Sequence, residues 1–289
     1  MKHFFKVAWL LLVPILAFGQ SSDYAMFENF YFTTKAGHAA DLKKSLSAHN
    51  KKYHPQGDYA AQVYSVQNGP NAGKLVWSMG PTTWTKIENR PQEEGHDGDW
   101  DENIAIHIES YDATEYYKMD DDLSNFPAPF DLSVLRLWMV DIGEDHDHHF
   151  DMIMKRIKAV NVESGSTLPF GVYRRQLAGS HGIDAILVWF VESLEWFDTQ
   201  SDFAKNYEAV HGEGSMDDLI DDWQAITDRV DVEIWRFDPE LSGHDGKAVE
   251  RDSPNRLCGR DPGQTCSAQA DHGEEQSCSA HEHTAGAGT

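Results

Sequence analysis

The sequence predicts an α+β protein built from two ferredoxin-like βαββαβ units, packed sheet to sheet as an intramolecular pseudo-dimeric barrel. Three observations predict this fold. They are an internal repeat, the same order of strand-like and helix-like segments in both copies, and a third strand that is apolar without interruption. The chain has 289 residues, which is enough for two domains of ordinary size.

The internal repeat is clearest at the last strand of each copy. Residues 115–120 (EYYKMD) are followed by Leu123-Ser124, and residues 233–238 (EIWRFD) are followed by Leu241-Ser242. Further matches occur in the same order. Val76-Trp77, followed by Trp84, matches Val188-Trp189, followed by Trp196. Val63-Tyr64 matches Val172-Tyr173, and His38 matches His146. Ordered matches of this kind indicate a tandem duplication. We therefore predict one unit at residues 25–124 and a second at residues 131–242.

Within each copy the apolar pattern changes between the period of a strand and the period of a helix. A strand opens each copy, at residues 26–33 and 133–141, and an amphipathic helix follows. In the second copy this helix has apolar residues at helical spacing: Phe150, Ile153, Met154, Ile157 and Val160. A hairpin, a further helical stretch and a closing strand complete the order βαββαβ, which places both helices on one face of an antiparallel sheet.

The third strand of the second copy predicts how the two units pack. Residues 185–191 (AILVWFV) are apolar throughout, as expected for a strand that is covered on both faces. Helices cover only one face of a ferredoxin-like sheet, so the other face needs a second cover. The sheet of the other copy supplies it, and covalent linkage makes this packing intramolecular. We therefore predict an internal pseudo-dimer.

The first 19 residues have the pattern of a signal peptide. Lys2 and Lys6 precede an apolar run over residues 7–18, and the small residues Ala17 and Gly19 suit signal peptidase. The run is shorter than the roughly 20 residues that a spanning helix needs. We therefore expect an exported protein, periplasmic or secreted, with no membrane insertion after signal cleavage.

The residues after the second unit, 243–289, are expected to form a disordered tail, because they are rich in Gly, Ser, Ala, Asp and His. All three cysteines, Cys258, Cys266 and Cys278, lie in this tail, so no disulfide is expected in the folded units. Cys278, His281 and His283 are possible metal ligands, although their spacing matches no standard zinc module.

The charge of the chain limits its partners. The formal net charge of −24 repels phosphate backbones, so nucleic acid is not expected as a partner. Anionic membrane surfaces are disfavoured for the same reason. Cationic ligands, and divalent metal ions held by carboxylates, remain compatible with this charge.

Polar and aromatic residues on the predicted strands are candidates for a ligand pocket. They are Asn29, Tyr31, Tyr64 and Trp84 in the first copy, and Arg136, Trp138, Tyr173 and Trp196 in the second. Arg136 could hold an anionic ligand, because a guanidinium group matches a carboxylate. The alternative is that the tryptophans pack in the core while Asn29 and Arg136 face solvent.

The densest group of potential metal ligands is the segment at residues 145–149 (DHDHH). On a helix, His146 and His149 are three residues apart and Asp145 and His149 are four apart, so each pair shares a face. Imidazole and carboxylate together suit zinc, copper or nickel. We therefore predict His146, His149 and Asp145 as candidate metal ligands. The alternative is an acidic helix start, where the helix dipole favours carboxylates.

The strand order, the Val-Trp pair that ends the third strand and the tryptophan early in the next helix resemble the dimeric α+β barrel superfamily. Its best-known members are antibiotic-biosynthesis-type monooxygenases. The resemblance covers residues 25–241 and implies the barrel fold. The superfamily also includes haem-degrading and cofactor-free oxygenases and chlorite-dismutase-like haem proteins, so the resemblance leaves the activity open.

The haem-degrading members allow a comparison by residue. They carry an asparagine on the first strand, a tryptophan after the third strand and a histidine further along that binds iron. Asn29 and Trp84 match the first two positions, whereas His96, His107 and His211 depart from the spacing of the third. Three functions therefore stay open. They are an exported small-molecule-binding barrel, a cofactor-free or haem-dependent oxygenase, and an envelope metal-binding or stress protein. Haem and a divalent metal are the possible cofactors.

Overall fold

The structure is a computed structural model that describes residues 24–55, 57–177 and 182–247. The predicted signal peptide, the three cysteines and most of the predicted tail lie outside these residues. In the described part of the chain, no helix is both long enough and apolar enough to cross a membrane.

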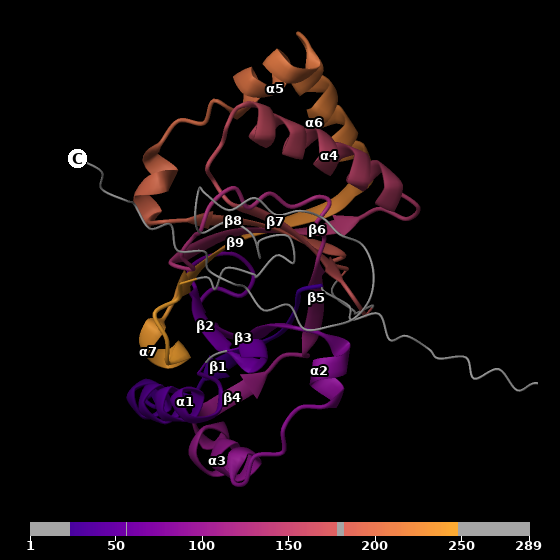
Figure 1. The fold of residues 1–289 in the computed structure, drawn as a ribbon. Coiled ribbons are helices and arrows are strands. Elements are labelled where there is room, and N and C mark those ends of the chain that lie inside the picture. Colours follow the sequence, from indigo (N-terminus) through magenta and orange to yellow (C-terminus); the bar gives the residue numbers. More distant parts are fainter. Residues whose placement is uncertain (1–23, 56, 178–181, 248–289) are drawn as a thin grey trace, which may run out of the picture. The chain divides into compact units, whose positions relative to one another are not determined.

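Helices and strands alternate in both halves of the described chain (Figure 1). The first half contains β1 (Met26–Thr34), α1 (Ala39–Tyr53), β2 (Ala61–Val66), β3 (Leu75–Thr82), α2 (Trp84–Glu88), α3 (His96–Asn103), β4 (Ile108–Tyr111) and β5 (Glu115–Met119). The second half contains β6 (Val134–Ile142), α4 (Asp147–Glu163), β7 (Phe170–Arg175), β8 (Ala185–Val191), α5 (Phe203–His211), α6 (Ser215–Ile226), β9 (Thr227–Phe237) and α7 (Pro239–Ser242). Short 3₁₀ helices include η2 (Ala105–His107) and η3 (Leu194–Asp198).

Eight of the strands form a closed antiparallel barrel. Their order is β3-β2-β9-β6-β8-β7-β5-β1, and the pairing of β1 with β3 closes the ring. The short strand β4 extends the sheet beside the second part of β1. The prediction of an α+β barrel is therefore confirmed. The halves do more than stack face to face, because β2 pairs with β9 and β5 pairs with β7.

The barrel interior is shared by the two halves, and helices cover the outside. Interior residues come from both halves, including Tyr31, Tyr64, Tyr117, Leu135, Leu137, Tyr173 and Trp235. The position of strand β8 between two cores explains why its residues are apolar throughout. Its Ile186 and Val188 face this interior, while Leu187 packs in a second core under α4 and α6. A third core lies under α1 and contains Leu42 and Leu46.

Each half inserts a Leu-Ser pair into the other half. Leu123 and Ser124, which follow β5, belong to the second half's packing: Leu123 joins the core under α4, and Ser124 Oγ accepts a hydrogen bond from the Val172 backbone N–H at 2.9 Å. Leu241 and Ser242, at the end of α7, do the same in the first half. Leu241 joins the core under α1, and Ser242 Oγ accepts from the Val63 N–H at 2.8 Å. The matched residues of the repeat thus make matched contacts. The beginning of the predicted tail is also packed, because His244 contacts the Ala61 carbonyl at 3.0 Å.

A buried carboxylate joins the two halves at one end of the barrel. Glu233 on β9 is completely buried and accepts hydrogen bonds from Trp235 Nε1 at 2.7 Å and from Asn71 Nδ2 at 2.9 Å. Tyr31 of the first half donates to it at 3.3 Å. Burial raises the pKa of Glu233, although these donors oppose the rise. The loop that carries Asn71 is fixed here as well, since Asn68 pairs with the Val232 and Ile234 backbone.

The exchanged Leu-Ser pairs predict that an isolated half cannot fold alone. A fragment of residues 131–247 lacks Leu123, which fills part of its own core. Its Leu241 has no first half to pack into, and the interior face of its sheet is exposed. We expect aggregation, or a homodimer in which two copies exchange this segment. Size-exclusion chromatography with light scattering distinguishes the outcomes. A monomer with a cooperative thermal transition would contradict the shared-core interpretation.

The raised pKa of Glu233 predicts a pH dependence of stability. Because the folded state holds this proton more tightly than the unfolded state, stability falls as the pH rises from the unfolded pKa through the folded one. Glu233→Gln removes this effect. Relative to wild type, its unfolding free energy should improve by up to about 1.4 kcal/mol for each pH unit in that window. Urea unfolding from pH 5 to pH 8 tests this, with exposed Glu109→Gln as the control. Parallel curves for Glu233→Gln and wild type would refute it.

Candidate metal centre

Three histidine side chains converge between α1 and α3 in the first half. His49 lies within α1, His54 follows its last residue, and His96 is the first residue of α3. One ring nitrogen from each lies within 4.8 Å of the others. The two helices lie beside each other on the outside of the barrel (Figure 1).

Local sequence places each of the three rings. The buried face of α1 carries Leu42 and Leu46, and His49 continues that face toward α3. The helix ends at Tyr53, and Pro55 disfavours helical backbone at the residue before it, so His54 turns out of the helix axis. Before α3, Gly95 takes a left-handed conformation (φ 81°) that glycine adopts without a Cβ penalty, and His96 follows directly.

Each histidine has an oxygen acceptor beside its Nδ1 atom. His49 Nδ1 is 2.8 Å from Asp99 Oδ2, His54 Nδ1 is 2.9 Å from the Tyr59 carbonyl, and His96 Nδ1 is 2.8 Å from Asp97 Oδ1. An acceptor at Nδ1 assigns the proton to that nitrogen in a neutral ring, which leaves a lone pair on Nε2. Metal-binding histidines are held in the same way by carboxylates and backbone carbonyls.

The Nε2 atoms of His54 and His96 are 3.1 Å apart, and that of His49 is buried without a hydrogen-bond partner among the described residues. The contact between His54 and His96 can be made by one proton shared between the two nitrogens or by a cation bound between them. Two nitrogens bound to one tetrahedral zinc ion lie about 3.4 Å apart, close to the separation found here.

Burial keeps two of these rings neutral. It lowers the pKa of His54 to about 4, and it also lowers the pKa of His49. Both are therefore uncharged near neutral pH, which is the form that binds metals. His49 and His54 are buried, whereas the His96 side chain is 26% exposed and borders solvent. Access to the centre is consequently from the α3 side.

Aromatic rings hold the cluster in place. The Tyr53 ring lies 4.9 Å from the rings of both His49 and His96, and Trp77 packs edge-on against His54 at 5.2 Å. Trp100 of α3 lies 5.4 Å from His49. Apart from these contacts α3 is weakly anchored, since none of its residues is classed as buried. The residues present thus fit a metal ion held by three neutral imidazoles.

A second group of potential ligands lies at the start of α1. One ligating atom from each of His38, Asp41 and His107 lies within 4.8 Å of the others. The Nδ1 atoms of the two histidines are 2.9 Å apart, and a single shared proton accounts for this contact. His107, which departs from the spacing of the haem ligand, is engaged in this way.

The metal ligands predicted from sequence lie at the start of α4. The rings of His146 and His149 are 5.5 Å apart, and Asp145 has a left-handed backbone (φ 65°). Among the described residues, the groups with three ligating atoms within 4.8 Å do not include these side chains. His211, considered above as a haem ligand, instead contacts the Arg156 carbonyl through Nε2 at 3.1 Å.

The pocket residues predicted from sequence fall in three places rather than one. Tyr31, Tyr64 and Tyr173 are buried in the barrel interior, and Asn29 is buried two residues before Tyr31 on β1. Trp84 is 38% exposed and lies against Tyr116 at the surface. Arg136, Trp138 and Trp196 meet on the outer wall of the second half.

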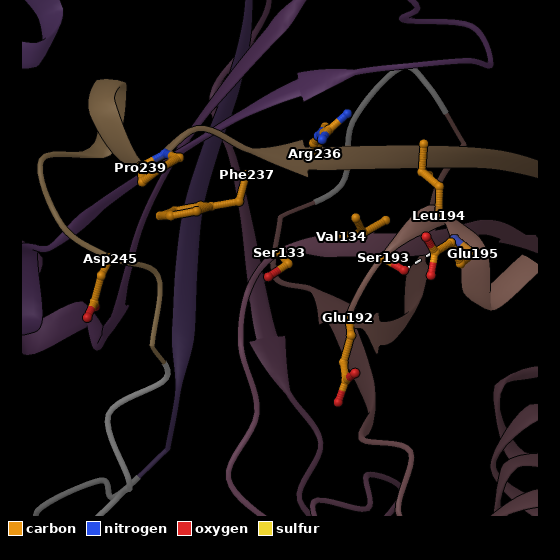
Figure 2. Close-up of a pocket in the computed structure, with 10 residues that line it drawn as sticks. All are labelled: Ser133, Val134, Glu192, Ser193, Leu194, Glu195, Arg236, Phe237, Pro239 and Asp245. Atoms are coloured by element: carbon orange, nitrogen blue, oxygen red, sulfur yellow. Dashed lines mark hydrogen bonds between the residues drawn. The ribbon is translucent and has the colours of Figure 1, made fainter.

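A cavity of about 480 Å³ lies at the end of the barrel where β6 begins and β9 ends (Figure 2). Its walls are Ser133, Val134, Glu192, Ser193, Leu194, Glu195, Arg236, Phe237, Pro239 and Asp245. None of the eight pocket residues predicted from sequence lines it. The cavity therefore represents a separate feature, close in sequence to Arg136 but distinct from the histidine cluster.

His49 and His54 received no attention in the sequence analysis. The available signal was weak: His49 continues the apolar face of a helix, and His54 stands before the proline that ends it. His96 is 42 residues beyond His54, after two strands and another helix. Only the folded chain brings these residues together.

Comparisons with known proteins extend to the fold alone. No protein-family model and no curated protein matches the chain. Three of the similar solved structures illustrate this. A monooxygenase-like protein of Lactobacillus acidophilus is 9% identical, covers 74% of this chain and 94% of its own, and has a TM-score of 0.47. Chlorite dismutase of Candidatus Nitrospira defluvii in complex with imidazole is 10% identical, with coverages of 76% and 95% and a TM-score of 0.47. An anthrone oxidase-like protein is 10% identical, with coverages of 75% and 92% and a TM-score of 0.45.

The closed eight-stranded antiparallel barrel confirms the α+β barrel fold that the sequence predicts. At identities of 9–10% and TM-scores of 0.45–0.47, the three structures carry nothing about the chemistry of this chain. The histidine cluster is therefore interpreted from its own geometry.

Asp99 is predicted to orient His49 for metal binding. Asp99→Asn keeps the shape of the side chain but removes its charge and allows the amide to present a donor to Nδ1. We expect metal affinity to fall about 10- to 100-fold, the usual effect of losing such a partner. Competition with a chromophoric chelator measures the affinity. Asp101→Asn on the exposed side of α3 is the matched control. Equal affinities for both variants would show that Asp99 has no such role.

Proposed function

We propose that this chain is a metal-dependent protein whose centre is one divalent transition-metal ion bound by His49, His54 and His96. The observation that carries the proposal is the convergence of one ring nitrogen from each of three histidines, each on a ring whose Nδ1 already has an acceptor. Among the functions left open by the sequence, this geometry supports metal binding best. The nitrogen ligands favour zinc, copper or nickel over magnesium or calcium.

The ligand number favours a reactive centre over a structural one. Structural zinc sites use four protein ligands, whereas catalytic sites use three and leave a position for water or substrate. Three neutral imidazoles also leave the full charge of the ion, which polarises an oxygen ligand in the open position. The protein residues have separate tasks. Asp99, Asp97 and the Tyr59 carbonyl fix the rings, and the partly exposed His96 leaves the approach from solvent.

The carboxylates near the centre match a bound cation. Asp97 and Asp99 contact the ligand rings directly, and Glu93 and Glu94 precede α3. A divalent ion among neutral rings gains from nearby negative charge, which also draws cations toward the exposed side. Asp97 and Asp99 also lie in the first turn of α3, where the helix dipole favours carboxylates, so both effects act in the same direction.

The wider setting of the centre also remains a proposal. The equivalent orders β5-β1-β3-β2 and β9-β6-β8-β7, with the exchanged Leu-Ser pairs, support duplicated ferredoxin-like units. Export to the periplasm or medium rests on the first 19 residues. The oxygenase alternative keeps the support of the fold, but the candidate haem ligand His211 already has another contact.

Metal analysis tests the proposal. Full-length mature protein, stripped by chelator and dialysed against limiting zinc or copper, should retain about one ion per chain at this centre. His49→Ala, His54→Ala and His96→Ala should each abolish tight retention. The control is the double variant His146→Ala/His149→Ala, which removes the ligands predicted from sequence and should keep the ion. Loss of metal in the control alone would place the site on α4, and retention in all variants would refute both sites. Circular dichroism confirms that each variant is folded.

A further inference from the structure

The outer wall of the second half carries an arginine without an acidic partner. Arg136 lies on β6, and its guanidinium carbon is 5.2, 5.3 and 5.9 Å from the ring centroids of Trp138, Trp189 and Trp196. We call these four residues the arginine–tryptophan cage. Arg136 makes no hydrogen bond or ion pair with any residue that the structure describes.

This is unusual for an acidic protein. The chain has 48 aspartates and glutamates against 24 lysines and arginines. Most described arginines have carboxylate partners: Arg90 with Glu28, Arg156 with Asp222, Arg174 with Asp147 and Asp151, Arg175 with Glu115, and Arg229 with Asp231. Three indole rings surround Arg136 instead, which removes water from the cation without neutralising it.

A second donor in the cage also lacks an acceptor. The Trp138 Nε1 atom is buried and has no hydrogen-bond partner among the described residues. A buried N–H without an acceptor is costly, and most such groups in proteins are paired. The cage therefore presents a guanidinium and an indole N–H, both requiring an acceptor that the described chain does not provide.

The cage is accessible and borders the cavity of Figure 2. All four side chains are partly exposed. Val134 lies two residues before Arg136, on the same face of β6. It pairs with Arg236 on β9, and both residues line the cavity. On the other side, Leu194 and Glu195 line the cavity just before Trp196 in η3. Figure 2 shows these side chains around the space between the start of β6 and the end of β9.

We propose that the arginine–tryptophan cage binds a small aromatic carboxylate. The guanidinium fork matches the two oxygens of a planar carboxylate, and the indole N–H of Trp138 offers a further donor. The indole faces provide the apolar wall against which an aromatic ring packs. This site is independent of the metal centre, which lies in the other half.

The charge of the neighbouring cavity limits the anion. Glu192, Glu195 and Asp245 line it beside Arg236. These carboxylates repel a multiply charged ligand, whereas a single negative charge held at Arg136 is compatible with them. The site therefore selects a monocarboxylate over inorganic phosphate. The competing explanation is that Arg136 only covers the tryptophans, in which case no ligand selectivity is expected.

Phenylacetate tests the proposal, with its neutral amide phenylacetamide as the matched probe. Isothermal titration of the full chain should show saturable binding of phenylacetate at millimolar or lower concentration. Phenylacetamide and inorganic phosphate should bind at least about tenfold more weakly, since neither offers a singly charged planar carboxylate.

Variants identify the residues responsible. Arg136→Gln should weaken phenylacetate binding at least about tenfold, and Arg136→Lys should restore part of the affinity. Trp138→Phe, which removes the indole N–H and shrinks one aromatic wall of the cage, should cause a smaller loss. Arg236→Gln, the neighbouring arginine, is the control and should bind nearly as wild type does. Unchanged melting temperatures show that the variants are folded. Absence of binding to wild type, equal binding of the amide, or full affinity in Arg136→Gln would each overturn the proposal.

Discussion

The structure depends on the exchange of one short segment between the halves. After β5 and again after β9, the chain leaves its own half and places a leucine and a serine in the other. Each serine accepts a hydrogen bond from a backbone N–H on a strand of the other half, Val172 on β7 and Val63 on β2. Together with the pairings of β2 with β9 and β5 with β7, these contacts satisfy the sheet edges and close the barrel. Closure removes the exposed edges at which sheets associate with other chains.

Closing the barrel also determines where chemistry can occur. The interior is filled by residues from both halves, and even its buried carboxylate, Glu233, is surrounded by hydrogen-bond donors. Each layer between barrel and helices takes one leucine from the other half, Leu123 under α4 and Leu241 under α1. The other residues of each layer come from its own half, so they can change without disturbing the common core. The two outer layers differ accordingly. The first holds imidazoles and carboxylates, and the second holds an arginine among indoles.

Much of the fold could be predicted from sequence because its signals are local or repeated. The uninterrupted apolar strand at residues 185–191 predicted cover on both faces, and β8 has it. The repeat predicted the two halves, although not the pairing between their edge strands, which depends on register and leaves no periodic signal. Packing of residues 243–247 was also missed, because their composition resembles that of a disordered tail.

The proposed metal centre could not be predicted in this way. The density of ligands along the sequence favoured residues 145–149, which stays a prediction, and Asp147 in that segment pairs with Arg174. The converging histidines are separated by a helix end and by 42 residues that include two strands. In the second half, Arg136 lies beside Trp138 and Trp196 because of alternation along β6 and the strand end of β8, whereas Tyr173, predicted with them, lies in the barrel interior.

The weak anchoring of α3 has a consequence for the behaviour of the protein in its surroundings. This acidic helix has no fully buried residue, and His96 and Asp99, which contact the proposed centre, hold it to α1 together with Trp100, whose ring also packs against Phe30 and Trp77. An ion bound there stabilises the attached helix by an amount that grows with the logarithm of the free metal concentration. Local opening of α3 would therefore report metal supply. In a metal-poor environment, the segment around residues 91–103 would be the first to lose hydrogen-exchange protection and to admit proteases.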